Sequence, residues 1–85
     1  MLYHAVPAGE VDEVLHRGLL PTNRPHVHLT WKPEHARSAV GEDASPVLFE
    51  VDAEALHDGG TLFYVSPKGT WLVDRVPTGF LTKVD

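Results

Sequence analysis

The chain contains no cysteine, and this absence constrains its fold more than any other single feature. It excludes a disulfide framework, a thiol nucleophile and a thiolate metal site. A chain of 85 residues must then depend on one apolar core, and scaling gives burial of roughly 60–65% of the surface that the unfolded chain exposes. We therefore expect residues 1–85 to form a single domain with no second lobe.

The order of the apolar segments indicates an α+β fold. Short apolar or alternating segments predict strands at residues 2–6, 26–30, 46–52, 61–65, 70–74 and 80–84. Helical spacing and end signals predict two short helices, at residues 10–17 and 33–40, and one helical turn at residues 53–57. Because the helices come early and the strands cluster late, we expect an α+β arrangement rather than alternating βαβ units.

Glycine and proline predict where these segments end. Gly18 occupies the place of a left-handed cap after the first helix. Pro33 suits the first turn of the second helix, and Gly41 ends it. Residues 66–69 suit a type I turn, and residues 21–25 are expected to form a loop.

The charge balance argues against autonomous RNA binding. Twelve acidic residues outnumber seven basic ones, for a formal net charge of −5, whereas nucleic-acid binders usually carry a basic face. A local patch remains open, because Arg17, Arg24, Lys32 and Arg37 all fall in the N-terminal half. No apolar run approaches the ~18 residues of a membrane helix, and the N-terminus lacks the pattern of a secretory signal. We expect a cytoplasmic protein.

Two histidines suggest a metal site only weakly. His26 and His28 project from the same face of a strand, and a third ligand such as His4 or Glu50 would complete a site. The alternative is that one imidazole is hydrogen-bonded in the core and the other is half exposed. We favour this alternative and expect no metal.

Familiar nucleophile and phosphate-binding motifs are missing. Ser38, Ser45 and Ser66 are the only serines, and none lies in a Gly-x-Ser-x-Gly motif. Gly59-Gly60 lacks both the lysine of a P-loop and dinucleotide-binding spacing. His4 and His28 are more informative, because strands that flank one cleft would turn both imidazoles toward a ribose hydroxyl or an amide. Otherwise both are ordinary half-buried strand residues.

Two blocks are specific enough to indicate a family, namely His26–Thr30 (HVHLT) and Phe63–Leu72 (FYVS followed by GTWL). Further matching segments are Leu2-Tyr3-His4, Gly18-Leu19, Arg24-Pro25, Val40-Gly41, Pro46–Leu48, Val51–Ala53, Gly60, Val76-Pro77 and Phe80-Leu81. Together they resemble the C-terminal lobe of the RNA 2'-phosphotransferases, in the family's order and over nearly the whole chain.

The resemblance implies a minimal ADP-ribosyltransferase-like fold, a split β-sheet core that binds NAD in a cleft between two sheets. His4 matches the family's strand-one histidine, His28 its second histidine and Thr30 its serine position. In the family these positions help to hold the nicotinamide and its ribose, and we take His4 and His28 as the catalytic pair. We expect Tyr64 and Trp71 to border the cleft, with core packing as the alternative role.

The resemblance also implies a reaction. A family enzyme uses NAD as a co-substrate and transfers an internal RNA 2'-phosphate to it, giving ADP-ribose 1'',2''-cyclic phosphate. The phosphate attacks the ribose carbon as nicotinamide leaves, so the protein must position both partners and stabilise an oxocarbenium-like centre.

This sequence departs from the family at three points. The resemblance covers the C-terminal lobe alone, without the arginines and histidine that hold the RNA phosphates. The family's arginine after the Val-Gly step is replaced by acidic residues in Glu42-Asp43, which repel a polyanion. The Gly-Thr after the strand-one histidine is Ala5-Val6 here.

Three functions follow from these observations. The first is transfer of ADP-ribose from NAD to an acceptor other than 2'-phosphorylated RNA. The second is a non-enzymatic module that binds a nucleotide, ADP-ribose or a protein partner. The third is a phosphotransferase half whose RNA-binding lobe comes from another chain. His4 and His28 favour the first, while Glu42-Asp43 disfavours the third.

We predict that the purified 85-residue chain does not remove a 2'-phosphate from RNA. Phosphates that meet Glu42 and Asp43, with no cationic clamp, would not be held for in-line attack. The measurement is incubation of the chain with NAD and a 2'-phosphorylated RNA. Robust conversion of the RNA would contradict the prediction.

Overall fold

A computed structural model describes residues 1–21 and 25–84 of the chain. The strands are β1 (Leu2–Val6), β2 (Val27–Leu29), β3 (Val47–Val51), β4 (Tyr64–Val65), β5 (Trp71–Val73) and β6 (Leu81–Val84). The helices are α1 (Val11–Arg17), α2 (Pro33–Val40) and α3 (Ala53–Asp58), with 3-10 turns η1 (Ala8–Glu10), η2 (Glu42–Ala44) and η3 (Thr78–Phe80). Most of the loop expected at residues 21–25, including Arg24, lies outside the described residues.

The α+β prediction is confirmed, with two differences in the elements. The single helical turn expected after β3 is a third helix, α3, because the Asp52 side chain accepts a hydrogen bond from the Ala55 N–H at 3.1 Å and caps it. The strand expected at residues 61–65 is reduced to β4, because the Thr61 N–H donates to the Leu56 carbonyl and closes the end of α3 instead.

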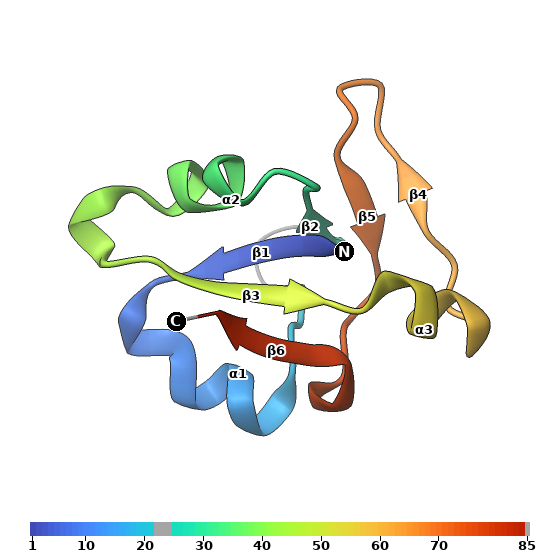
Figure 1. The fold of residues 1–85 in the computed structure, drawn as a ribbon, viewed down its shortest axis with the longest axis horizontal. Helices are drawn as coiled ribbons and strands as arrows, with labels where there is room; N and C mark the ends of the chain where they lie inside the picture. Colours follow the sequence, from blue (N-terminus) through green and yellow to red (C-terminus); the bar gives the residue numbers. More distant parts are fainter. Residues whose placement is uncertain (22–24, 85) are drawn as a thin grey trace.

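The strands form two antiparallel sheets, ordered β1-β3-β6 and β2-β5-β4 (Figure 1). Two isolated bridges lie outside these ladders. Tyr3 and Thr30 exchange backbone hydrogen bonds of 2.6 and 3.0 Å, and Leu19 and Val76 exchange bonds of 2.8 and 2.9 Å. The split sheet implied by the family resemblance is therefore present. The Tyr3–Thr30 bridge links β1 of one sheet to the end of β2 in the other, while the Leu19–Val76 bridge joins the segment after α1 to the segment after β5.

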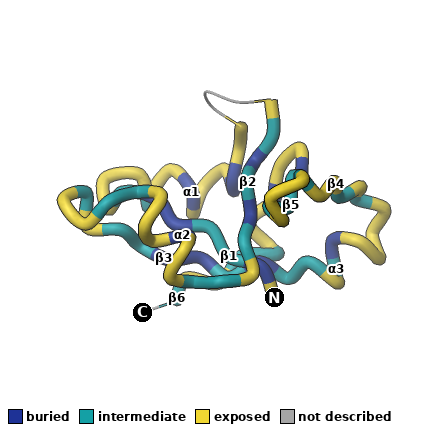
Figure 2. The backbone as a smooth tube through the Cα atoms, turned by 90° about the horizontal axis from the view of Figure 1, so that it is seen from above, coloured by how far each residue is buried: buried dark blue, intermediate teal, exposed yellow. Residues whose placement is uncertain are grey.

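One main core lies between the sheets and α1, and a smaller one lies under α2. The largest fully buried side chains are Leu29, Phe49, Val51 and Val73, which come from both sheets, and Val76, which follows β5. The smaller cluster, Ala5, Ala36 and Leu48, joins the other face of the first sheet to α2. Figure 2 shows β2 between the two halves, with exposed residues gathered in the outer turns.

Gly18 is required by a close backbone contact. As expected, α1 ends there, with the Gly18 N–H donating to the Val14 carbonyl at 2.8 Å. Its φ is 79°, but its ψ of −169° differs from a left-handed cap. A Cβ at this position would lie 2.1 Å from the Val76 carbonyl oxygen. Glycine therefore lets the chain after α1 reach the Leu19–Val76 bridge.

We predict that Gly18→Ala lowers the free energy of unfolding by at least about 2–3 kcal/mol, since it combines a strained φ with a backbone clash. Chemical denaturation measures this loss. Gly79→Ala is the matched control, because a Cβ at Gly79 meets no atom within 4 Å. Equal stability of the two variants would refute the role given to Gly18.

Candidate functional site

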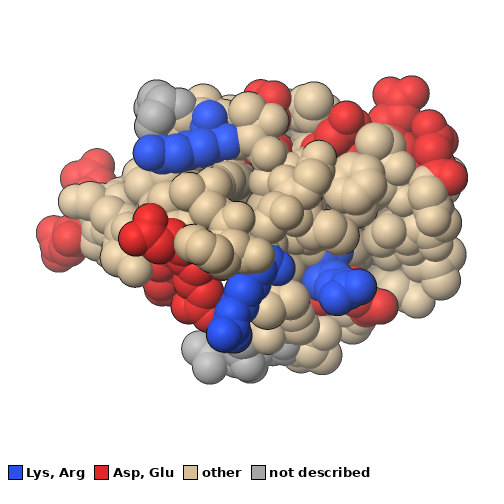
Figure 3. Space-filling view, turned by 90° about the horizontal axis from the view of Figure 1, so that it is seen from below, with Lys and Arg blue, Asp and Glu red and all other residues tan. Residues whose placement is uncertain are grey.

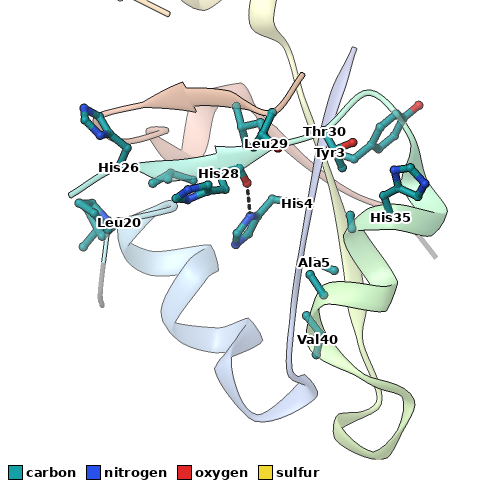
Figure 4. A pocket seen from close by; sticks show the side chains of 15 residues that line it. Tyr3, His4, Ala5, Leu20, His26, His28, Leu29, Thr30, His35 and Val40 are labelled. Carbon is teal, nitrogen blue, oxygen red and sulfur yellow. Dashed lines mark hydrogen bonds between the residues drawn. The ribbon is translucent and has the colours of Figure 1, made fainter. Parts of the chain in front are cut away.

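A cavity of about 440 Å³ opens where β1 and β2 diverge beyond the Tyr3–Thr30 bridge. Its wall is formed by β1, β2, α2 and the segment at Leu20-Pro21 (Figure 4). The volume lies within the ordinary range of small-molecule sites, about 300–1,000 Å³. Four imidazoles line it, those of His4, His26, His28 and His35.

The free edge of β1 supplies unpaired backbone groups to this cavity. In an antiparallel strand, alternate residues turn their N–H and C=O groups to opposite edges. Tyr3 uses both groups in its bridge to Thr30, on the edge away from β3. Ala5 turns its groups to that same edge, and no described residue pairs with them there. One donor and one acceptor of the main chain therefore face the cavity.

The same alternation directs the His28 carbonyl toward β1. The Ser66 N–H donates to the Thr70 carbonyl. This bond determines which residues of β4 and β5 are hydrogen-bonded to each other. Through the pairing of β5 with β2, it also determines which residues of β2 turn their backbone groups toward β5. His28 therefore turns its backbone groups away from β5. The His4 ring takes the place of a strand partner, with its Nδ1 2.8 Å from the His28 carbonyl oxygen (Figure 4).

This hydrogen bond determines what the rest of the His4 ring can do. A carbonyl oxygen only accepts, so Nδ1 carries the hydrogen, and in the neutral ring Nε2 is left as an acceptor. Burial lowers the pKa of His4 below its ordinary value of 6.5, against the opposing effects of the His28 carbonyl and the charge of Glu10. His4 is thus neutral at pH 7 and offers a hydrogen-bond acceptor.

The structure brings together three of the five residues that the sequence indicated. His4, His28 and Thr30 all line the cavity. Tyr64 does not line it; its ring lies 5.8 Å from that of His26, at the periphery. Trp71 lines a separate cavity with Phe63.

Strand register places Trp71 on the opposite face of its sheet from His28. Trp71 lies opposite Leu29, and Leu72 lies opposite His28. Opposed residues share a face of the sheet and successive residues alternate, so Trp71 turns to the face that bears the buried Leu29. The sequence predicts Trp71 at the border of the cleft but does not give this register.

Sequence reasoning missed His35 and the backbone of Ala5. Both line the cavity, with His35 drawn beside Tyr3 and Thr30 in Figure 4. Ala36, Ala39 and Val40 also line it, and their helical spacing is the only sequence signal that this face of α2 meets the site.

The described residues do not support a metal centre. They contain no group of three histidine, cysteine, aspartate or glutamate side chains that could hold an ion. Glu50, considered as a third ligand, is not among the residues that line the cavity. Within the same residues, no helix has the length and apolar character needed to cross a membrane.

The described residues that line the cavity carry no permanent positive charge. The described lining residues include no lysine or arginine, and the nearby Lys32 places its Nζ 4.8 Å from the centre of the Trp31 ring. On the face shown in Figure 3, lysine and arginine side chains do not merge into a continuous patch. This arrangement is unlike the basic surface that a polyanion needs.

We predict that lowering the pH from about 7.5 to about 5.5 destabilises the chain, in part through His4. The folded state lowers the pKa of His4, so below 6.5 the unfolded state binds the proton more readily. The contribution of His4 is thus complete above pH 6.5 and is lost as the pH falls toward the folded pKa.

Urea unfolding at both pH values tests this effect. In His4→Gln, whose amide can still donate to the His28 carbonyl, the fall in unfolding free energy should be smaller than in the parent chain. An identical pH dependence in the two proteins would show that His4 contributes nothing.

Comparisons with known proteins identify the family of this chain. Residues 1–75 match the family model described as RNA 2'-phosphotransferase, Tpt1 / KptA family. A probable RNA 2'-phosphotransferase of Nostoc punctiforme is 40% identical over 83 residues, which are 98% of this chain and 46% of that protein. Its counterpart in Hahella chejuensis is 39% identical over 84 residues, or 99% and 45%.

The matches also show how much of each relative this chain covers. A probable RNA 2'-phosphotransferase of Pseudomonas aeruginosa PAO1 is 40% identical over 81 residues, which are 95% of this chain but 44% of that protein. The chain thus spans less than half the length of these curated relatives. Because the family model covers residues 1–75 of 85, the chain belongs to the RNA 2'-phosphotransferase (Tpt1/KptA) family.

Proposed function

We propose that the chain binds NAD in the histidine-lined cavity and transfers its ADP-ribosyl group to an acceptor, as an NAD-dependent transferase on an ADP-ribosyltransferase-like core. The observation that carries the proposal is the adjacency of two features on β1. The unpaired N–H and C=O of Ala5 lie next to His4, whose neutral ring offers Nε2 as an acceptor. The cavity of about 440 Å³ is of suitable size.

The edge of β1 suits a carboxamide. A carboxamide has one acceptor and a donor on the same side, so it can pair with a strand edge as another strand would. The Ala5 N–H would donate to the carboxamide oxygen of nicotinamide, and the Ala5 carbonyl would accept from its NH₂ group. A backbone site of this kind is rigid, because the Tyr3–Thr30 bridge and the β3 pairing hold β1 on both sides.

The neighbouring side chains suit a ribose. Nε2 of His4 would accept a hydrogen bond from a ribose hydroxyl, while its Nδ1 remains held by the His28 carbonyl. The Thr30 oxygen already accepts from the Lys32 N–H at 3.3 Å, so its own hydrogen is free to donate. The His28 imidazole lines the same space. The geometry gives no support to the predicted contacts of Tyr64 and Trp71 with NAD.

NAD supplies an ADP-ribosyl group whose bond to nicotinamide breaks as the acceptor attacks the ribose carbon. The chain contributes orientation, through Ala5 and His4, and hydrogen bonds that hold the ribose while positive charge develops on it. A neutral His4 is suited to this role, since an imidazolium would repel the developing charge.

The acceptor is proposed to be something other than 2'-phosphorylated RNA. The described lining residues include no lysine or arginine, Glu42 and Asp43 form the exposed turn η2, and the net charge is −5. The names of the relatives refer to proteins of about twice this length. An RNA-binding lobe from another chain would supply the missing cations, and that arrangement is the alternative enzymatic function.

We predict that NAD or ADP-ribose binds weakly, with a dissociation constant from tens of micromolar to millimolar, or about −4 to −6 kcal/mol. The described lining residues include no lysine or arginine to neutralise the pyrophosphate of the ligand. Titration followed by amide chemical shifts should perturb His4, Ala5 and His28. His28→Ala should abolish the binding, whereas Lys83→Ala, on β6, should leave it unchanged.

Release of nicotinamide separates the candidate functions. Incubation with NAD, with and without acceptors that carry hydroxyl, carboxylate or phosphate groups, should give release that His4→Ala abolishes. Binding without any release would identify a non-enzymatic module. Release that depends on an added RNA-binding lobe would identify the split phosphotransferase. If several millimolar NAD causes no shifts, the proposed site is wrong.

A further inference from the structure

A second cavity, of about 460 Å³, lies at the N-terminal end of β1. Its wall is formed by the start of β1, by α3, and by two aromatic residues of the second sheet and the segment before it (Figure 1). No residue lines both this cavity and the histidine cavity. The volume lies within the range of small-molecule sites, about 300–1,000 Å³, so the second cavity is large enough for a compact ligand.

Phe63 and Trp71 form an aromatic corner in the second cavity. Their ring centres are 6.3 Å apart and their ring planes are inclined at 77°, so the edge of one ring meets the face of the other. Such a T-shaped pair encloses a corner that is bounded by one face of each ring. The faces of aromatic rings are the negative part of their quadrupole, and they attract a cation within about 6 Å of the ring centre. The aromatic corner therefore favours a positively charged ligand.

Glu54 adds a formal negative charge to the same cavity. It lies in the first turn of α3 and lines the cavity together with Ala53 and His57. Among the described residues its carboxylate has no ion-pair partner, and the lining residues include no lysine or arginine. Asp52 and Asp58 lie at the two ends of the same helix. The charge around the cavity is thus complementary to a cation.

We propose that the second cavity binds the trimethylammonium group of a small choline-like cation. Methyl groups cover the nitrogen of such a cation, so its surface is apolar although its charge is positive. It can therefore contact the apolar wall of Met1, Leu2 and Ala53 and the faces of the aromatic corner at the same time. A primary ammonium is more strongly hydrated and would lose water at this apolar wall. The proposal is independent of the proposed function.

Titration with choline chloride, followed by NMR at about pH 8 where imidazoles are neutral, tests the site. The indole N–H signal of Trp71 should shift and saturate, with a dissociation constant of about 1–10 mM. Trp31 is an internal reference, because it is 62% exposed but the Lys32 Nζ already lies 4.8 Å from the centre of its ring. Its signal should not follow the titration, and sodium chloride should shift neither indole.

A neutral ligand of the same shape isolates the effect of charge. In 3,3-dimethyl-1-butanol a carbon atom replaces the nitrogen of choline. This alcohol fills the same space without attraction to the ring faces or to Glu54, so it should bind at least about fivefold more weakly than choline. Equal binding of the two compounds would overturn the proposal, since the cavity would then select apolar surface alone.

Two variants test the residues that provide the attraction. Glu54→Gln removes the charge with little change of shape and should weaken choline binding at least about threefold. Glu34→Gln is the matched control, because Glu34 is also exposed and lies in the first turn of a helix, α2; it should leave the binding unchanged. Phe63→Leu removes one ring and should weaken the binding at least about fivefold.

Circular dichroism verifies that the Phe63→Leu chain is folded, and Glu54→Gln keeps the test valid if it is not, because Glu54 is exposed. Absence of any Trp71 shift at about 50 mM choline would overturn the proposal. Binding to Glu54→Gln and folded Phe63→Leu that equals binding to the parent chain would overturn it too.

Discussion

The arrangement of this chain depends on two backbone hydrogen bonds between Tyr3 and Thr30, of 2.6 and 3.0 Å. They are the only ladder contact between β1 and β2 in the described residues. Had the pairing continued, the backbone groups of Ala5 and His28 would have hydrogen-bonded to each other, and β1 and β2 would have joined the two sheets into one. Because it stops after one bridge, both strands keep a free edge, and the cavity lies between those edges.

His4 makes this divergence possible. A carbonyl at the edge of a buried gap needs a partner, and the His4 ring supplies one for His28 at 2.8 Å. No buried side-chain nitrogen or oxygen of the described residues lacks a hydrogen bond. One contact therefore holds the two strands at a fixed separation, selects the tautomer of His4 and leaves Nε2 as an acceptor. His4→Ala therefore removes the structural and the proposed chemical role of this residue together, whereas the amide of His4→Gln can still donate to the His28 carbonyl.

Local rules predicted much of the fold but little of the register. β1 and α2 lie where strand alternation and the Pro33–Gly41 signals predicted them. The position of Gly18 was predictable too, although its reason, the contact with Val76, is a tertiary one. The placement of Trp71 opposite Leu29 depends on pairing between distant segments, and so does the loss of strand at residues 61–63 to the end of α3. The place of His35 at the cavity also depends on contacts between distant segments, which local rules do not predict.

The described strands of the split sheet leave several edges without a strand partner. Two three-stranded sheets have four edges, at β1, β6, β2 and β4. The β1 and β2 edges face each other around the cavity, and β6 bears the exposed Lys83, a charge that discourages pairing. β4 has no such charge. Unpaired backbone groups are costly when they are buried, so the proposed ligand would satisfy the groups that β1 leaves without a strand partner in the described structure.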